Sequence, residues 1–170
     1  MKEDFIEISK PVGLLRRFGA IVYDGFLLFA VLFFASLPIV LGLGITYEHP
    51  FYLVYVIYIY MVAFVFFGWF WTQDGQTLGM KTWHIQIRQN NGELINWKQA
   101  LLRYSSVLLF WIPAAVGYFL FSTSNLHRVL LLGLVPIAAD YLACVFDPER
   151  RALHDMISRT RLVLINSKTR

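Results

Sequence analysis

The sequence predicts an all-α membrane protein: a bundle of four transmembrane helices with a small cytoplasmic β-hairpin or sheet and a C-terminal amphipathic helix. Three observations predict this fold. Of the 170 residues, 58% are apolar and 15% are charged, against roughly 25% charged residues in typical soluble domains. Four apolar stretches approach or exceed the roughly 20 residues that cross a bilayer. The basic residues gather on one side of these stretches, as the positive-inside rule requires.

The four apolar stretches contain almost no charge. The first contains Asp24 and the fourth contains Asp140, while the second and third contain no charged side chain. A soluble helical domain could bury one such helix but not four, so we expect each stretch to span the membrane. The predicted spans are residues 18–45, 51–71, 104–121 and 129–146.

The basic residues predict the orientation. Fourteen of the fifteen Lys and Arg residues lie in the N-terminal segment, in the loop 72–103 or in the tail 147–170, and only Arg128 lies in a turn on the other side. We therefore expect a multi-pass protein of the cell (inner) membrane with both termini cytoplasmic. The topology and the anionic lipid of the bilayer explain the net charge of +4, so no nucleic-acid partner is expected. Residues 1–170 are predicted to form one domain.

The cytoplasmic loop carries a strand pattern. Apolar and polar residues alternate over residues 83–88, and Asn91-Gly92 follows, a dipeptide that favours a hairpin turn. Leu94 and Ile95 are expected to form the return strand. Two strands alone are marginal in water, so we expect the apolar run 162–165 of the tail to join them.

The start of the tail reads as a helix. Asp147 is a good N-cap and Pro148 suits the first helical position. The pattern predicts an amphipathic helix over residues 148–158 that lies on the membrane or under the bundle. Its expected apolar face consists of Ala152, Leu153, Met156 and Ile157.

Three ordered motifs resemble those of the RDD family, prokaryotic membrane proteins named for one arginine and two aspartates. The motifs are Arg16-Arg17-Phe18-Gly19-Ala20 with Asp24; residues 74–81 with Arg88 and Gly92; and Phe146-Asp147-Pro148 with residues 150–155 and Thr160. The resemblance places the arginine at Arg17 and the two aspartates at Asp24 and Asp155. The chain departs from the pattern at Met80, where a basic residue is common, and at Arg161, where an apolar residue is usual. Lys81 is then the candidate for a basic role near Met80.

The resemblance implies little about activity. Most members are uncharacterised, the family has been suggested to take part in transport, and some members are described as cation/proton antiporters. Fold-level analogy of this kind says nothing about a site by itself.

Asp24 and Asp140 are the candidate ion- or proton-binding residues. Asp24 follows Arg17 by seven residues, or about 10 Å of helix, and Asp140 precedes Asp147 by the same interval, so both carboxylates should lie at similar depth. A charge at mid-membrane costs about 2.5–3.5 kcal/mol on insertion scales. In one interpretation the two carboxylates face each other across a cavity, bind a small cation or proton, and are tuned by Arg17. In the other, Asp24 pairs with Arg17, Arg103 or a tail arginine and locks the bundle.

A second set of residues is predicted to be structural. Asp155, with Arg151 one turn earlier, is expected to pair with Arg17 or Arg103 and to clamp the tail under the bundle. Tyr58 and Tyr60 could line a cavity or simply pack. The structural charge clamp is thus assigned to Asp155, Arg103 and Arg151.

Enzyme signals are absent from the sequence. The four histidines have no zinc spacing, Cys144 has no partner, and the glycine run 75–82 does not match a phosphate-binding loop. We expect no catalytic residue, metal or cofactor. The sequence leaves two functions open: exchange of a small cation with protons, for which four helices suggest a homo-oligomer, or a membrane scaffold or accessory subunit of a membrane complex.

Overall fold

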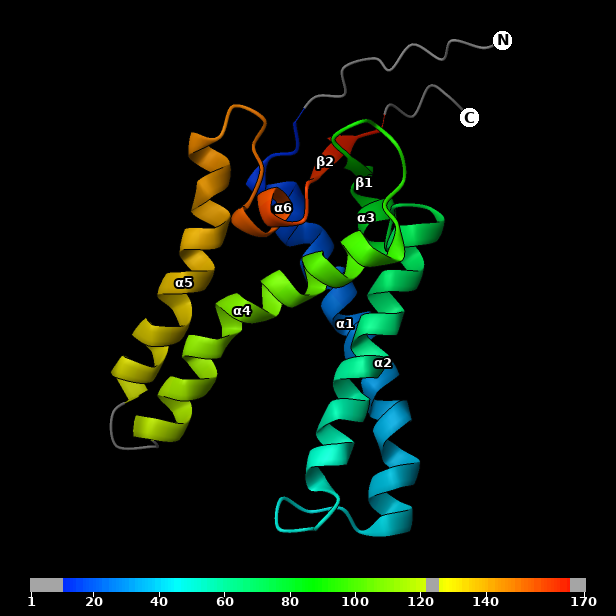
Figure 1. The fold of residues 1–170 in the computed structure, drawn as a ribbon, viewed down its shortest axis with the longest axis vertical. Helices are drawn as coiled ribbons and strands as arrows, with labels where there is room; N and C mark the ends of the chain where they lie inside the picture. The colour runs from blue at the N-terminus through cyan, green and yellow to red at the C-terminus, as the bar shows by residue number, and fades with distance from the viewer. Residues whose placement is uncertain (1–10, 122–125, 166–170) are drawn as a thin grey trace.

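A computed structural model describes residues 11–121 and 126–165. Two pairs of long helices diverge from a compact layer of short elements (Figure 1). The first pair is α1 (Leu14–Leu43) and α2 (Tyr52–Gln73). Within the described residues these are the two helices that are long and apolar enough to cross a membrane. Helix α1 begins before the predicted span, so Arg17 is already helical.

The second pair is α4 (Trp97–Phe121) and α5 (Leu126–Phe146), which pack against each other. These helices contain the other two apolar stretches. Each has an internal proline, Pro113 in α4 and Pro136 in α5. A proline inside a helix removes one backbone hydrogen bond and favours a bend.

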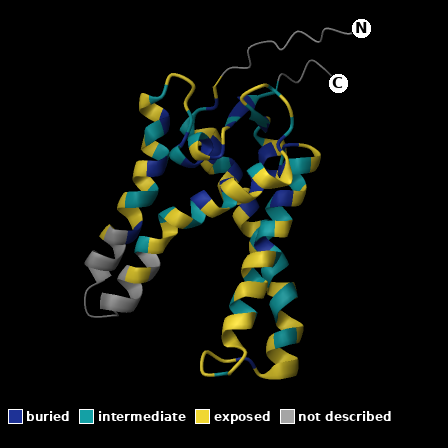
Figure 2. Cartoon of the chain, viewed as in Figure 1, coloured by how far each residue is buried: buried dark blue, intermediate teal, exposed yellow. Residues whose placement is uncertain are grey.

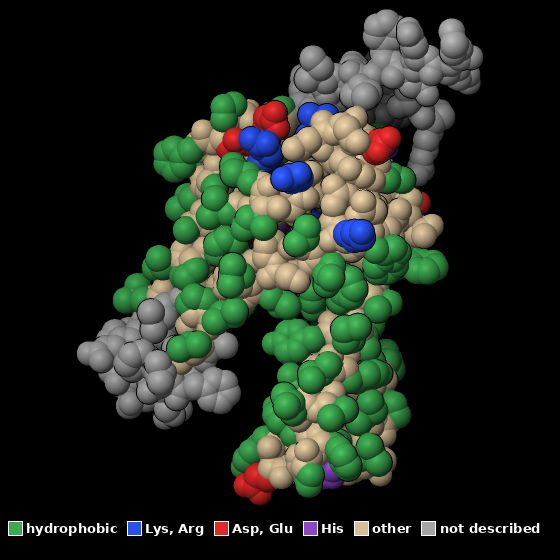
Figure 3. All heavy atoms as spheres, viewed as in Figure 1, with side chains coloured by type: hydrophobic (Ala, Val, Ile, Leu, Met, Phe, Trp, Pro, Cys, Tyr) green, Lys and Arg blue, Asp and Glu red, His purple; other side chains and the backbone are tan. Residues whose placement is uncertain are grey.

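The surface divides by chemistry. Exposed positions cover most of α1 and α2 (Figure 2), and they are apolar: Phe26, Phe29 and Phe34 are each about 70% exposed. Figure 3 shows hydrophobic side chains over both helix pairs and the Lys and Arg side chains over the layer of short elements. Apolar patches this large are unfavourable in water and suit a lipid environment.

The layer of short elements, called the cap below, holds a two-stranded sheet. It consists of α3 (Leu78–Thr82), β1 (Ile85–Gln89), α6 (Leu153–Ile157) and β2 (Thr160–Leu164) with their connections. Strands β1 and β2 are antiparallel, with Ile85 opposite Leu164, and Pro11 forms a bridge to Val163. The tail strand therefore joins the loop strand, as the sequence predicts.

The predicted return strand at Leu94 and Ile95 is wrong. The turn itself forms, since Gly92 has a φ of 89° and the Gln89 N–H donates to the Glu93 carbonyl at 2.9 Å. Beyond it, the Asn96 side chain accepts from the Gln99 backbone N–H at 2.9 Å and caps α4. This cap starts α4 directly after the turn, so β1 pairs with the tail rather than with its own hairpin.

The predicted tail helix is shorter than residues 148–158. Helix α6 begins at Leu153, because Arg150 has a φ of 52°, which a continuous right-handed helix does not allow. The Asp147 carboxylate accepts from the Arg151 backbone N–H at 2.9 Å and holds this turn. The buried residues of α6 are His154 and Asp155, whereas Ile157 is half exposed. The inner side of this helix is therefore polar.

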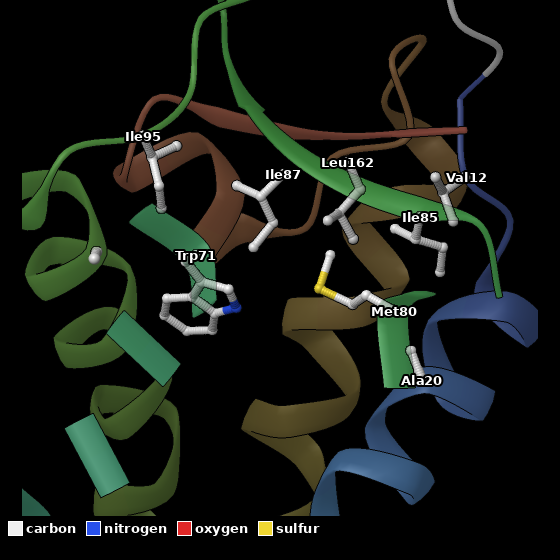
Figure 4. Close-up of a cluster of buried hydrophobic side chains, with 9 residues drawn as sticks. Val12, Ala20, Trp71, Met80, Ile85, Ile87, Ile95 and Leu162 are labelled. Carbon is white, nitrogen blue, oxygen red and sulfur yellow. The ribbon is translucent and has the colours of Figure 1, made fainter. Parts of the chain in front are cut away.

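A cluster of buried apolar side chains lies where the cap meets the long helices (Figure 4). It is built from α1, α2, α3, α4 and both strands, and Ile85 and Ile87 at its centre are 1% exposed. Its buried members are Val12, Ala20, Trp71, Met80, Ile85, Ile87, Ile95, Ala100 and Leu162. The cap thus fixes the ends of the long helices, and with them the charged residues that these ends carry.

Candidate functional site

Asp155 is the centre of a buried charge cluster at the junction of the cap and the long helices. It is fully buried on α6, and Arg17 of α1 donates from Nη1 to its Oδ2 at 2.7 Å. Arg103 of α4 donates from Nη1 to Oδ1. The backbone N–H of Ala152 donates to Oδ2 at 3.0 Å, so the same carboxylate caps α6. Asp155 therefore ties three helices together.

The two arginines are bonded on their remaining sides as well. Arg17 donates from Nη2 to the Arg150 carbonyl at 2.5 Å. Arg103 donates from Nη1 to Oγ1 of Thr160 at 2.8 Å, and its guanidinium lies 5.4 Å from the centroid of the Trp71 ring. A buried cation needs such compensation, because burial removes its hydration.

The charge state of Asp155 follows from these contacts. Complete burial alone would raise the pKa of Asp155, but the electrostatic attraction of Arg103, His154 and Arg17 and the hydrogen bond from Arg17 outweigh it. The pKa is held well below its ordinary value. Asp155 is therefore a carboxylate throughout the physiological pH range.

Asp140 of α5 is bonded to the residue next to Asp155. Its Oδ1 accepts from the His154 backbone N–H at 2.9 Å, and its Oδ2 lies 2.6 Å from His154 Nδ1. His154 Nε2 lies 3.2 Å from Nη2 of Arg103. Because a guanidinium only donates, Nε2 must accept and Nδ1 must carry the proton. From the contact with Arg103 we assign His154 the Nδ1–H tautomer; its Nε2 also lies 3.3 Å from Oδ1 of Asp155.

Asp24 of α1 lies outside this charge cluster and bonds to the start of α3. Its Oδ2 accepts from Thr77 Oγ1 at 2.5 Å and its Oδ1 accepts from the Gly79 backbone N–H at 2.9 Å. Thr77 Oγ1 in turn accepts from the Met80 N–H, as the N-cap of α3. A Cβ on Gly79 would lie 2.4 Å from the Ala20 carbonyl oxygen, so only glycine lets α3 approach α1 this closely.

The candidate ion-binding residues are therefore placed with separate partners. Asp24 binds α3, Asp140 binds His154, and Arg17 binds Asp155 rather than tuning the other two. The alternative expectation, that Asp24 pairs with an arginine, also differs from the structure, since threonine and backbone N–H groups are its partners. A short helix brought beside α1 supplies these donors, and periodicity along α1 alone could not reveal them.

The charge clamp is partly rearranged. Asp155 contacts Arg103 and Arg17, but Arg151 forms its ion pairs with Asp147 at 3.0 Å and Glu149 at 3.4 Å. The left-handed residue Arg150 turns the chain between the end of α5 and Arg151, which leaves the Arg151 side chain beside Asp147 and Glu149 of the preceding turn.

The tyrosines of α2 do not join the cluster. Tyr58 donates to the Ala35 carbonyl of α1 at 3.3 Å, and Tyr60 is about half exposed. Tyr58 lines an open groove between α1 and α2 whose other walls include Val31, Met61 and Phe66. This groove is apolar, so it is not a wet path for an ion.

The sequence did not identify three of the residues that hydrogen-bond to the buried charged groups. They are His154, which bonds to Asp140; Thr77, which donates to Asp24; and Thr160, which accepts from Arg103. Thr77 two residues before Gly79 is a weak N-cap signal. In the part of the chain that the structure describes, no three His, Cys, Asp or Glu side chains are grouped to hold a metal ion.

Comparison with known proteins gave one match. A model described as the RDD family matches residues 11–159. A search of curated proteins and a search of solved structures returned no match. The matched range includes α1 to α6 and with them Arg17, Asp24, Asp140 and Asp155.

Proposed function

This chain belongs to the RDD family of membrane proteins, and we propose that it is a non-catalytic membrane scaffold or accessory subunit that crosses the bilayer four times. Its role would be to hold the cap in a fixed position at the cytoplasmic ends of the helices. Partner subunits would then recognise the cap or the apolar faces of the helices.

The bonding of the three acidic residues is the observation that carries this proposal. Asp24, Asp140 and Asp155 are each less than 10% exposed, and each carboxylate is bonded through both oxygens to donors of the protein. A transported cation needs carboxylate oxygens with vacant positions and a hydrated route to them. Bonds of this kind suit a fixed assembly instead.

The four-span topology is supported by composition and surface. Helices α4 and α5 expose apolar side chains, including Trp111, Leu134 and Val145, much as α1 and α2 do. The basic side chains gather on the cap (Figure 3), which would place the cap and both termini in the cytoplasm.

Cysteine labelling in intact cells tests this topology. In a Cys144→Ala background, His49→Cys lies in the loop between α1 and α2, and Asn91→Cys lies in the cap. An impermeant thiol reagent should label the first and not the second. Labelling of Asn91→Cys from outside would overturn the orientation.

Exchange of a cation with protons is the second candidate, and one observation favours it. The Asp140–His154 pair is a buried acid and imidazole within hydrogen-bond distance, a combination that can take up a proton. In this function Asp140 would exchange that proton for a small cation.

Flux through proteoliposomes separates the two candidates. The scaffold predicts no proton-coupled flux of Na⁺ or K⁺ above that of empty liposomes, for the parent and for Asp140→Asn alike. Robust flux in the parent that Asp140→Asn abolishes, while Glu149→Gln at an exposed site leaves it intact, would establish the exchanger.

A positive test of the scaffold is its assembly in native membranes. Mild solubilisation and native electrophoresis should show the chain in a complex larger than a monomer. Asp155→Ala should release the chain from that complex, because its cap is no longer held. A parent that migrates only as a monomer would contradict the proposal.

A further inference from the structure

The imidazole of His154 lies between Asp140 on one side and Arg103 and Asp155 on the other. It is 3% exposed and faces Asp140 and Tyr141 of α5, Arg103 of α4 and Asp155 of its own helix. Arg17 of α1 lies beyond it, on the other oxygen of Asp155. Every helix that meets α6 in this cluster therefore presents a charged or polar group near the ring.

The present contacts accommodate one proton on the ring. Nδ1–H donates to Asp140 Oδ2 at 2.6 Å, and the lone pair of Nε2 accepts from Arg103 Nη2 at 3.2 Å. The ring therefore bonds α6 to α5 through one nitrogen and to α4 through the other.

A second proton on the ring would disrupt the contact with Arg103. It would add to the lone pair of Nε2, and the new N–H would point at an N–H of Arg103, 3.2 Å away. Oδ1 of Asp155, 3.3 Å away, has a second lone pair for this N–H, but it would then be shared with Arg103, which already donates to it. Protonation thus replaces a hydrogen bond by a donor facing a donor and brings a second cation beside Arg103.

We propose that His154 and Asp140 form a proton-binding site that controls how firmly α6 is seated against α4 and α5. With one proton the pair holds α6 in place. A second proton, taken from the cytoplasmic solution onto Nε2, breaks the contact with Arg103 and loosens α6. The site binds a proton as its ligand and responds to acidification.

The Asp155 clamp does not respond in the same range. The pKa of Asp155 is held well below its ordinary value by Arg103, His154 and Arg17, and a proton on His154 acts in the same direction, so Asp155 stays charged at mildly acidic pH. The loosening is therefore local to the His154 contacts, and the chain remains tethered by Arg17 and Asp155. The inference rests on the proposed function in one respect, namely that α6 is a fixed part of the cap.

Hydrogen exchange of the purified chain in lipid nanodiscs tests the site. Exchange at α6 is followed through the Met156 and Ser158 amides, which donate to Ala152 and His154. Rates are measured at about pH 8 and about pH 5.5, on either side of the usual histidine range, and are divided by the intrinsic rate at each pH. The protection of these amides should fall about tenfold or more at the lower pH.

Two variants locate the effect. His154→Asn keeps an N–H group where Nδ1 donates to Asp140 but cannot take a second proton, so its protection at α6 should be the same at both pH values. His84→Asn removes a histidine of the cap outside the cluster and should respond like the parent.

The outcomes separate the inference from the proposed function. Equal protection of the parent at both pH values, or a full pH response in His154→Asn, would overturn the proton site. An α6 that is unprotected at both pH values would instead contradict the fixed cap. If His154→Asn does not fold, ¹⁵N-histidine spectra of the parent decide, since the site requires an Nδ1–H tautomer at pH 8 that becomes an imidazolium as α6 loses protection.

Discussion

Replacing Asp155 by alanine should destabilise this protein more than any other single change to a charged residue of the cap. The substitution removes the carboxylate that accepts from Arg17, Arg103 and the Ala152 N–H, and leaves two buried guanidinium groups without their counter-charge. Neither arginine can turn to solvent without leaving the cluster, since both are about 95% buried or more.

The magnitude follows from this geometry. Removing one partner of a buried ion pair costs about 3–5 kcal/mol, because the remaining charge is left desolvated and unpaired. At about 2–4 °C per kcal/mol for a chain of this size, the melting temperature should fall by about 6–20 °C. Asp155→Asn keeps an acceptor for Ala152 but not the charge, so it should show most of the same loss.

Thermal unfolding in detergent, followed by circular dichroism, measures this loss. The matched control is Asp74→Ala, which removes an ion pair with Lys81 whose side chains are 41% and 56% exposed. An exposed pair contributes about 0–1 kcal/mol, so this variant should melt within a few degrees of the parent. An Asp155→Ala protein as stable as Asp74→Ala would show that the cluster does not hold the cap.

The stabilisation that Asp155 provides should depend on pH, and the direction of the dependence follows from its lowered pKa. A carboxyl group whose pKa is depressed on folding contributes stability above its unfolded pKa of about 3.9 and loses it as the pH falls through the folded pKa. In a His154→Asn background, which removes the neighbouring proton site, the stability difference between the Asp155 protein and Asp155→Ala should therefore be constant from about pH 8 to about pH 5. It should shrink only below about pH 4.

Two further substitutions test the junction of α1 and α3 by thermal unfolding. Gly79→Ala places a methyl group 2.4 Å from the Ala20 carbonyl oxygen and should destabilise by about 1–3 kcal/mol or more, whereas Gly25→Ala, with no atom within 4 Å, should be neutral. Thr77→Ala removes the cap of α3 and the donor to Asp24 and should cost about 1–2 kcal/mol. Thr77→Ser keeps the hydroxyl and should recover most of that loss. Equal melting temperatures of the Ala and Ser variants would show that the hydroxyl does not stabilise the protein.

Much of the fold could be predicted because its helices and the strand β1 follow from the residue types of short, continuous segments. Long apolar runs specify helices suited to lipid, and the alternating residues 83–88 specify β1. The two incorrect predictions, the return strand and the length of the tail helix, occur where a single residue changes the direction of the chain. Asn96 caps α4 and removes the return strand, and the turn at Arg150 shortens the tail helix. Such capping and positive-φ turns have weak sequence signals, because many residues permit them.

The choice of charged residues was also predictable, and so was the pairing of Asp155 with Arg17 and Arg103. The partners of Asp24, Asp140 and Arg151 were not predicted. A carboxylate in an apolar stretch must find a partner, so Asp24 and Asp140 are conspicuous in the sequence, and Arg17, Arg103 and Asp155 stand beside predicted spans. Their partners come from segments 14 to 138 residues away along the chain. No spacing along one helix can identify such a partner.

Composition is thus sufficient to predict a membrane protein, and the order of the charges predicts its orientation, because lipid and water each favour particular residue types. Which residues form each buried contact depends on how the cap packs against the ends of the long helices. The folded chain puts α6 where Arg17 and Arg103 converge and α3 against Asp24, and it joins His154 to Asp140. Those contacts exist only after distant segments have packed, since a buried charge accepts whichever donor the packed backbone brings within about 3 Å.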